Sequence, residues 1–397
     1  MVAGVAALVG LVVIAAALLT SGVLGREDAP VDVGPVVGTW EQAPALQRIR
    51  GSTSAIALPD GKVAAVGGGL GSVPLAATEL LDPDAQAWTP TGDLTEARRG
   101  HRAVALEDGR LLVAGGFDGS DLLASAEVYD PAAGTWSPTG PMAEPRLGHT
   151  MTVLADGAVL VTGGTGETGA AGQGSQSIQP SASAELYEPD TGIWESVGEM
   201  LVPRFEHTAT PLPDGRVLIA GGQGRQRDEV APVADVELYD PNTRTFSRTA
   251  PMLNARTDHA AAALDDGRVL VVGGDAGDAA IATAELFEPA RGSWSEVAPM
   301  RQPRRGHSVT LLEDGTVLAA AGEFFVRGSR TSLASAERYD PAEDVWANAG
   351  EMGCPRSEHG AARLADGTVL LAAGDAAFPG NPPIAQSCVD VYSPASG

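Results

Sequence analysis

A unit of about 50 residues recurs along this chain, and the repeat limits the fold more than any other feature of the sequence. Asp-Gly pairs start at positions 60, 108, 156, 214, 266, 314 and 366. Seven residues after each aspartate comes Gly-Gly, which becomes Ala-Gly in the last two copies. An arginine precedes each aspartate by ten residues: Arg50, Arg98, Arg146, Arg204, Arg256, Arg304 and Arg356. A histidine precedes it by seven residues in six copies: His101, His149, His207, His259, His307 and His359. Such constant spacing predicts one structural unit repeated seven times.

The second half of each copy is equally regular, as "AEVYDPAAGTW" at 126–136 illustrates. Its acidic position holds Glu79, Glu127, Glu185, Glu237, Glu285, Glu337 and Asp390. Nine residues later comes an aromatic residue: Trp88, Trp136, Trp194, Phe246, Trp294 and Trp346. The last copy ends at "VYSPASG", before its aromatic position, whereas Trp40 in "VVGTWEQAP" has no such unit in front of it. We therefore expect the segment around Trp40 to complete the last copy.

Each copy has the pattern of four short strands. An alternating stretch precedes Asp-Gly, and an apolar run such as "AVLVTGG" follows it. After a loop come "AELYEP", a proline-containing turn and a strand around the aromatic residue. One such sheet cannot bury both of its faces alone, whereas seven sheets packed face to face around an axis can. The sequence predicts an all-β, seven-bladed β-propeller over residues 36–397, in which the N-terminal strand closes the last blade.

The double glycine that ends the second strand, followed by tyrosine and tryptophan at fixed spacing, resembles the kelch repeat. The resemblance covers residues 36–397 and extends to the central domain of galactose oxidase. It is specific for the fold. Kelch propellers serve as binding platforms, actin partners, sialic-acid mutarotases and copper oxidases, and a shared fold does not choose among these functions.

The first 25 residues, "MVAGVAALVGLVVIAAALLTSGVLG", are apolar and uncharged. About 20 apolar residues span a bilayer as a helix, so residues 1–25 are expected to form a transmembrane anchor. The alternative is a signal peptide cleaved after Gly25, which would leave a secreted protein. Either interpretation exports the rest of the chain, with residues 26–35 as a short polar tether.

The net charge is −25, from 26 basic and 51 acidic residues. So acidic a surface repels phosphate backbones and anionic lipid headgroups, which argues against nucleic acid as a partner. We expect a monomer that contacts the membrane through its N-terminal helix only.

The histidines and tyrosines are the residues best suited to metal or acid–base chemistry. All six histidines, however, share one position of the repeat. Metal ligands must lie about 2.0–2.1 Å from one point, and equivalent positions on separate blades are expected to lie too far apart. We expect the histidines to pack between blades, and we predict no metal or cofactor. The tyrosines also fill one repeat position, which argues against a copper oxidase: Tyr129, Tyr187, Tyr239, Tyr339 and Tyr392. No catalytic residue stands out, so the sequence favours a protein that is not an enzyme.

The seven repeat arginines and the seven acidic positions are expected at the same end of each blade, because strands one and three run in the same direction. One interpretation is seven bidentate Arg–carboxylate pairs, each within one blade. The other is a cationic ring at the mouth of the central channel, able to bind a carboxylate or another anion. The equal numbers of arginines and acids favour the pairs.

Cys354 and Cys388 are the only cysteines, and both lie in the last copy. In an exported protein a disulfide between them is reasonable, and closing the loop between them would stabilise the fold by roughly 3–4 kcal/mol. The alternative is two free thiols, because the second strand separates them in the predicted blade.

The loops between the second and third strands vary in length from copy to copy, whereas the other turns barely vary. Binding residues collect on loops held by a rigid scaffold. Phenylalanines outside the repeat positions all fall on this face, and "EFFVRGSR" at 323–330 adds two arginines, a composition enriched at interface hot spots. The candidate binding residues are Phe117, Phe205, Phe324, Phe325, Arg327, Arg330 and Phe378. The alternative is that these phenylalanines fold back as small plugs beneath the loops.

Together these patterns predict an exported, membrane-anchored propeller that binds a protein or a glycan through its loops. One alternative is a carbohydrate-active enzyme that resembles the sialic-acid mutarotases, and another is a structural envelope component without a specific ligand. An enzyme needs unpaired arginine and acidic side chains that converge on a pocket, whereas a binding scaffold pairs them blade by blade.

Overall fold

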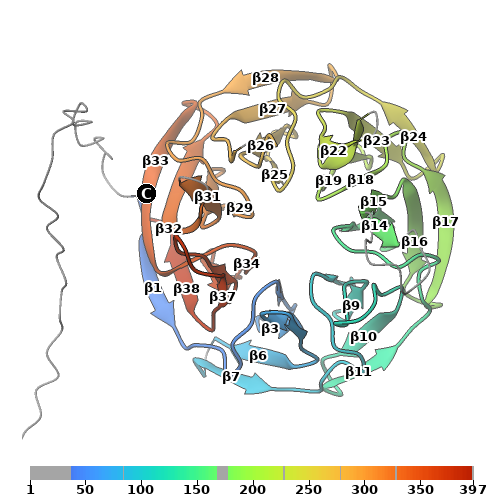
Figure 1. Cartoon of the computed structure of the whole chain (residues 1–397), viewed down its shortest axis with the longest axis vertical. Coiled ribbons are helices and arrows are strands. Elements are labelled where there is room, and N and C mark those ends of the chain that lie inside the picture. Colours follow the sequence, from blue (N-terminus) through green and yellow to red (C-terminus); the bar gives the residue numbers. More distant parts are fainter. Residues whose placement is uncertain are drawn as a thin grey trace, which may run out of the picture. The chain divides into compact units, whose positions relative to one another are not determined.

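The computed structural model describes residues 37–83, 85–167, 178–226, 229–277, 279–326 and 329–395, and these residues are all-β. They contain seven antiparallel sheets, six of four strands and one of five, arranged around a central axis as a β-propeller (Figure 1). The predicted helix at 1–25 and the tether at 26–35 lie outside the described residues. Within those residues, no helix is long and apolar enough to cross a membrane.

In the first six sheets the main strands follow the chain from the axis outwards, and in the last sheet β1 takes the outer place. The innermost strands are β2 (Ser54–Ala57), β8 (Arg102–Ala105), β12 (Thr150–Val153), β19 (Thr208–Pro211), β25 (Ala260–Ala263), β29 (Ser308–Leu311) and β34 (Gly360–Arg363). The second strands are β3 (Val63–Val66), β9 (Leu111–Ala114), β13 (Val159–Thr162), β20 (Val217–Ala220), β26 (Val269–Val272), β30 (Val317–Ala320) and β35 (Val369–Ala372). The third strands are β6 (Thr78–Asp82), β10 (Ala126–Asp130), β16 (Ser183–Glu188), β23 (Val236–Asp240), β27 (Ala284–Glu288), β32 (Ser329–Asp340) and β38 (Val389–Ser393). The outer strands are β7 (Ala87–Pro90), β11 (Thr135–Pro138), β17 (Ile193–Glu199), β24 (Thr245–Arg248), β28 (Ser293–Val297), β33 (Val345–Arg356) and β1 (Thr39–Ala43).

The core lies between neighbouring sheets rather than at one centre. The second strand of every sheet is buried along its whole length, and β20, with the sequence VLIA, is typical. Such a strand is apolar on both faces because a neighbouring sheet covers each of them. At the far end of each innermost strand the Asp-Gly turn is built locally. The Asp266 carboxylate accepts the N–H of Arg268 at 3.0 Å, and Gly267 takes a left-handed conformation with φ of 85°.

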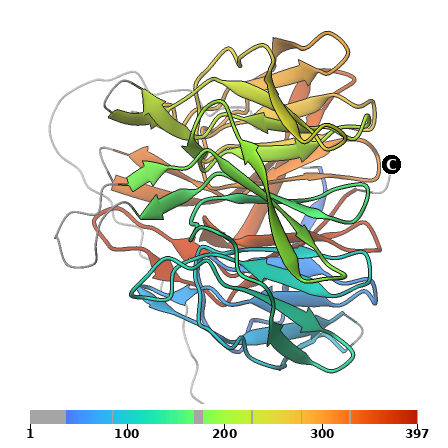
Figure 2. The same ribbon diagram turned by 90° about the vertical axis from the view of Figure 1, so that its right-hand side faces the viewer.

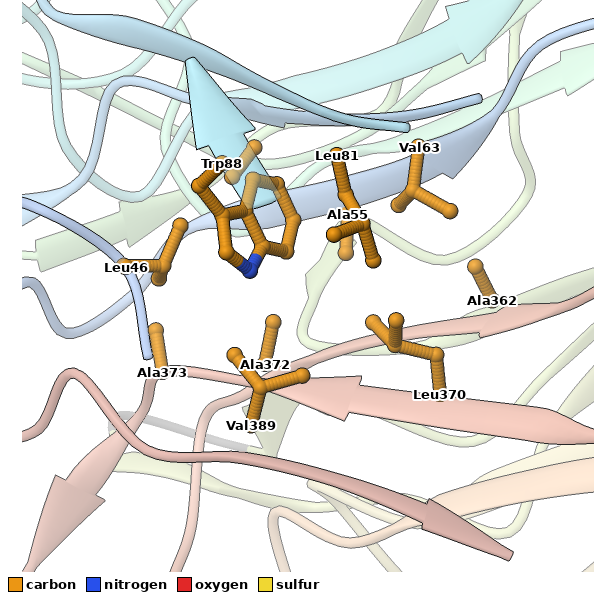
Figure 3. Close-up of a cluster of buried hydrophobic side chains, with 11 residues drawn as sticks. Leu46, Ala55, Val63, Leu81, Trp88, Ala362, Leu370, Ala372, Ala373 and Val389 are labelled. Carbon is orange, nitrogen blue, oxygen red and sulfur yellow. The ribbon is translucent and has the colours of Figure 1, made fainter. Parts of the chain in front are cut away.

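The N-terminal strand closes the ring, as the sequence predicts. β1 pairs with β38 in antiparallel register, with Trp40 opposite Tyr392 and their ring centroids 5.2 Å apart. The Trp40 indole N–H also donates to the carbonyl of Ala349 in the sixth sheet at 2.8 Å. Figure 3 shows the next interface, where Trp88 and Leu81 of the first sheet face Leu370 of the last. First and last sheets therefore pack like any other neighbours.

The connections between second and third strands form short hairpins. Their strands are β4 (Gly69–Leu70), β5 (Val73–Pro74), β14 (Thr165–Glu167), β15 (Ile178–Pro180), β21 (Gln223–Gln226), β22 (Glu229–Pro232), β31 (Glu323–Val326), β36 (Asp375–Ala376) and β37 (Ile384–Ala385). A further short strand, β18 (Arg204–Phe205), lies before the innermost strand β19 and pairs with β21. These hairpins project on the left side of Figure 2, away from the Asp-Gly turns. We call this side, together with the segments that lead into the innermost strands, the loop face. A disulfide joins Cys354 to Cys388 there and fixes the start of β38 to the end of β33.

Candidate functional site

Each repeat arginine is buried and paired with the acidic residue of its own sheet. Arg256 is representative: its Nη2 lies 2.6 Å from Glu285 Oε1, and neither side chain has any exposed surface. Its Nη1 donates to the carbonyls of Gly273 at 2.8 Å and Thr283 at 3.0 Å. The same ion pair recurs as Arg50–Glu79, Arg98–Glu127, Arg146–Glu185, Arg204–Glu237, Arg304–Glu337 and Arg356–Asp390. Each arginine therefore pairs within its own sheet as expected, but Arg256 shows that one guanidinium nitrogen binds the carboxylate and the other binds carbonyls, rather than the expected bidentate contact.

The other alternative, a ring of accessible arginines at the channel mouth, is wrong. The guanidinium groups point into the sheets, where Arg256 binds the carbonyl that follows the second strand, the carbonyl and hydroxyl of Thr283 before the third strand, and the carboxylate on the third strand. The acid also binds the backbone, since Glu285 accepts the N–H groups of Leu253 at 2.6 Å and Asn254 at 3.1 Å. Each pair thus holds the segment that enters the innermost strand of its own sheet.

The histidines pack between sheets, as expected. His259 Nε2 lies 3.0 Å from Thr208 Oγ1 of the preceding sheet. The first glycine of the preceding Gly-Gly pair accommodates the ring, because a Cβ on Gly221 would stand 2.7 Å from His259 Cε1. Burial lowers the pKa of His101, His259 and His359 to about 3. The imidazoles are thus neutral at physiological pH.

These histidines predict a loss of stability in mild acid. The folded-state pKa of about 3 lies below the usual 6.5. The contribution of the buried neutral histidine to the free energy of unfolding is therefore complete above pH 6.5 and is lost as the pH falls towards 3. Each such histidine should lower the free energy of unfolding by about 1.4 kcal/mol per pH unit below 6.5. Urea unfolding between pH 7 and pH 5 measures the slope. The variant His101→Gln should show a shallower dependence of the free energy of unfolding on pH, by the contribution of one histidine. Equal slopes for variant and parent would show that His101 does not cause the loss of stability.

A cavity of about 590 Å³ lies at the mouth of the channel on the loop face. The cavity is lined in part by the residue immediately before the histidine position of each copy: Ser52, Gly100, Gly148, Glu206, Asp258, Gly306 and Glu358. All seven residues have a left-handed backbone conformation, with φ between 47° and 67°. Backbone hydrogen bonds join the members from Gly148 to Glu358 in turn, such as Gly306 N–H to the carbonyl of Asp258 at 3.0 Å. We call these residues the mouth ring.

Three members of the mouth ring are acidic, and their charges interact. Burial raises the pKa of Asp258 well above its usual range, and the negative charges of Glu206 and Glu358 raise it further. Burial and the charge of Glu358 likewise raise the pKa of Glu206. The nearest cation, Arg305, lies 3.9 Å from Asp258 but is engaged by Asp275 at 2.9 Å and Glu323 at 2.8 Å. The cavity thus holds a surplus of partly desolvated carboxylates.

The predicted binding residues occupy different environments. Phe325 and Phe378 are 38% and 43% exposed, and the Arg305 guanidinium lies 4.8 Å from the centre of the Phe325 ring. Arg330 is half-exposed, 3.6 Å from Glu323. Two further candidates, Phe117 and Phe324, are half-buried, and Arg327 lies outside the described residues.

Phe205 is a correction. It is only 6% exposed, because β18, to which it belongs, pairs with β21 beneath the loop surface. Its side chain therefore packs inside the loop face, as the plug alternative describes, and it is not accessible to a partner.

Exposed apolar side chains are concentrated on the loop face. Eleven large apolar side chains of the described residues are well exposed. Nine belong to loop hairpins or to segments before innermost strands: Ile49, Leu70, Val73, Leu201, Val230, Leu253, Phe325, Phe378 and Ile384. The other two, Ile193 and Val345, begin outer strands. Five of the nine lie on hairpins of the adjacent sixth, seventh and first sheets.

The residues that a tyrosine–cysteine copper centre would need do not fit one here. The tyrosines are buried in the sheets, where the Tyr129 and Tyr187 hydroxyls lie 2.7 and 2.9 Å from the hydroxyls of Thr91 and Thr139. Both cysteines are in the disulfide. Across the described part of the chain, no three His, Cys, Asp or Glu side chains are arranged to hold a metal ion.

Two stretches, residues 97–143 and 256–301, match the family model of the kelch motif. No curated protein matches the chain. Among solved structures, a fungal alcohol oxidase of the AA5 family in complex with copper is similar, with a TM-score of 0.71 and 17% identity over 90% of this chain and 76% of the oxidase. That likeness concerns the fold.

Proposed function

We propose that this protein of the kelch repeat family is a protein-binding module whose partner docks on the loop face. The exposed apolar side chains of three adjacent sheets carry the proposal: Leu70, Val73, Phe325, Phe378 and Ile384. Soluble monomers rarely expose contiguous apolar groups, and such patches mark interaction sites. Arg305 against Phe325 and the neighbouring Arg330 add the residue types that dominate binding energy at protein interfaces.

The arginine–carboxylate pairs support a scaffold. They lie within each sheet and hold the segments beneath the loops, so the exposed groups are presented on a rigid support. A preorganised surface loses less conformational entropy on binding, which favours affinity.

The same proposal includes the number of blades and the location of the propeller relative to the membrane. From the seven sheets of four or five strands, we propose a seven-bladed propeller over residues 36–397. Residues 1–25 would carry it outside the cytoplasm, and residues 26–35 would space it from the membrane. The Cys354–Cys388 disulfide is in keeping with an oxidising, extracytoplasmic compartment.

Capture of a partner tests the proposal. The full chain in mild detergent, a Phe325→Ser/Phe378→Ser variant and an Ile193→Ser/Val345→Ser control would each be incubated with native envelope and medium. The control removes residues that are 60% and 51% exposed, on outer strands. We expect the parent and the control to retain a protein that the loop variant loses, at equal melting temperatures. Equal capture by all three would move the site away from these hairpins.

A second candidate, a carbohydrate-active enzyme, is favoured by one observation: Glu206 and Asp258 have raised pKa values in a cavity, as general acids do. Such an enzyme would have to use Arg102, which also lines the cavity, because Arg305 is engaged by Asp275 and Glu323.

A further inference from the structure

We propose that the Cys354–Cys388 disulfide is a redox-sensitive link that controls the loop face of the last sheet. Residues 353–358, which lead into the innermost strand β34, are called the entry segment below. When a dithiol reduces the disulfide, the entry segment and the adjacent hairpin of β36 and β37 loosen, and the docked partner binds more weakly. The effect on docking rests on the proposed function, whereas the loosening does not.

The disulfide joins two positions of the repeat that other sheets join by a hydrogen bond. Cys354 stands two residues before the repeat arginine, and Cys388 stands two residues before the acidic position. In the sixth sheet these positions hold Gln302 and Ser335, and the Ser335 hydroxyl donates to Gln302 Oε1 at 2.9 Å. A covalent bond therefore takes the place of a hydrogen bond in the last sheet. The hydrogen bond recurs in the third and second sheets as Ser183–Glu144 and Ser125–Glu96.

The acidic residue of the last sheet also makes fewer hydrogen bonds to its entry segment. In the sixth sheet, Glu337 accepts two successive backbone N–H groups, from Arg301 at 2.7 Å and from Gln302 at 3.1 Å. The last sheet has the shorter Asp390, which accepts the N–H of Gly353 at 2.9 Å and, within the described residues, no second N–H of the entry segment. The disulfide therefore replaces two of the hydrogen bonds that hold the corresponding segment of the sixth sheet.

The entry segment is joined to the hairpin that carries two of the exposed apolar side chains. Ser357 and Asp375 exchange two backbone hydrogen bonds of 2.9 Å, and Cys388 follows the end of the same hairpin by three residues. Phe378 and Ile384, which are 43% and 55% exposed, lie on the chain between these two attachments. Reduction removes the covalent link between the entry segment and the base of the hairpin, so both gain mobility.

The reaction is thiol–disulfide exchange with a dithiol. One thiolate of the reductant attacks a disulfide sulfur and forms a mixed disulfide, and one cysteine leaves as a thiol. The second thiolate of the reductant then releases the other cysteine. The protein gains two electrons and two protons, and the reductant becomes a disulfide. Cys354 and Cys388 are half-buried rather than enclosed, so a reductant can reach them.

Hydrogen exchange of the full chain in mild detergent, before and after treatment with millimolar dithiothreitol, tests the loosening. Alkylation and mass spectrometry count the thiols formed in the folded protein. We expect both cysteines to become thiols. The amides of Gly353, Ser357 and Asp375 should exchange at least about tenfold faster, as after loss of one hydrogen bond to a charged group. The equivalent amides of the sixth sheet are the control and should change less than about twofold: Arg301, Arg305 and Glu323.

Three results would overturn the proposal. The first is a disulfide that stays intact in the folded chain under millimolar dithiothreitol. The second is equal exchange before and after reduction. The third is equal acceleration in the sixth and last sheets, which would show that the disulfide supports the whole fold rather than its own loop face.

Two variants test whether the disulfide replaces the hydrogen bonds of the sixth sheet. Cys354→Ala/Cys388→Ala removes the link and should exchange as fast as the reduced parent. Cys354→Gln/Cys388→Ser/Asp390→Glu rebuilds the bonds of the sixth sheet, so it should exchange within about twofold of the oxidised parent, with or without dithiothreitol. Equal mobility of the two variants would overturn the proposal. If the alanine variant does not fold, the folded and then reduced parent provides the same comparison.

Partner capture tests the control of docking. We expect the oxidised parent to retain a protein that the reduced parent retains several-fold less, and the rebuilt variant to retain it in both conditions. The rebuilt variant has no cysteine, so it also reveals any effect of dithiothreitol on the partner. Equal capture by the oxidised and reduced parent would overturn redox control of docking. Faster exchange on reduction without any captured partner would defeat the proposed function and leave the redox-sensitive link standing.

Discussion

Replacing Arg256 with alanine should lower the free energy of unfolding by about 3–5 kcal/mol, a large part of the stability of a typical domain. The change leaves the Glu285 carboxylate buried without its counter-ion and removes the hydrogen bonds that Arg256 donates to the carbonyls of Gly273 and Thr283. Urea unfolding at pH 7 measures the loss. As a control, Arg248→Ala breaks an exposed pair with Asp235 and should cost less than about 1 kcal/mol.

The double variant Arg256→Met/Glu285→Leu distinguishes the destabilisation caused by an unpaired buried charge from that caused by lost packing. Removing both charges leaves no unpaired ion in the core, so its loss should be smaller than that of Arg256→Ala plus that of Glu285→Leu. It should still be less stable than the parent, because the N–H groups of Leu253 and Asn254 lose their acceptor. Simple additivity would show that the pair does not act as a unit.

Trp40→Ala should destabilise the fold by about 3–5 kcal/mol, as truncation of a packed tryptophan does. The change removes the contact with Tyr392 and the hydrogen bond to Ala349 that joins the last sheet to the sixth. Thermal unfolding measures the effect, and hydrogen exchange should show faster opening of β1 and β38.

Trp294→Ala is the matched control for ring closure. Trp294 makes the same contacts, with a ring 5.1 Å from Phe287 and a hydrogen bond of 2.9 Å to Ala250, but its strand follows directly from its own sheet. We expect a similar loss of stability with exchange that does not spread to β1 and β38. If deletion of residues 37–43 left the melting temperature unchanged, β1 would not be needed to close the ring.

The repeat made most of the fold predictable from sequence. Fixed spacing located the four strands of each sheet and the buried arginine–acid pairs, and the missing aromatic position in the last copy assigned Trp40 to that sheet. These predictions succeeded because each depends on short-range patterns that recur in every copy. The pairing of Cys354 with Cys388 was left open because sequence spacing alone does not fix the distance between two strands.

The mouth ring could not be predicted in the same way. Its only signal was an acid before the histidine, in "FEH", "TDH" and "SEH", where three other copies have glycine. That these acids meet depends on ring closure, which brings together residues from separate copies. Phe205 was misplaced for the opposite reason: the short strand that buries it is set by pairing with β21, and no periodicity announces it.

The closure of the ring by β1 also sets the order of events during synthesis. Trp40 is made among the first described residues and Tyr392 among the last, yet they are partners in one sheet. The N-terminal strand must therefore remain unpaired until nearly the whole chain has been made, and in an exported protein until it has also crossed the membrane. A chain cut short by one copy would expose an apolar face on the first sheet and another on the sixth, and such surfaces are prone to aggregate. The position of a single strand thus makes completion of the chain a condition for a soluble product.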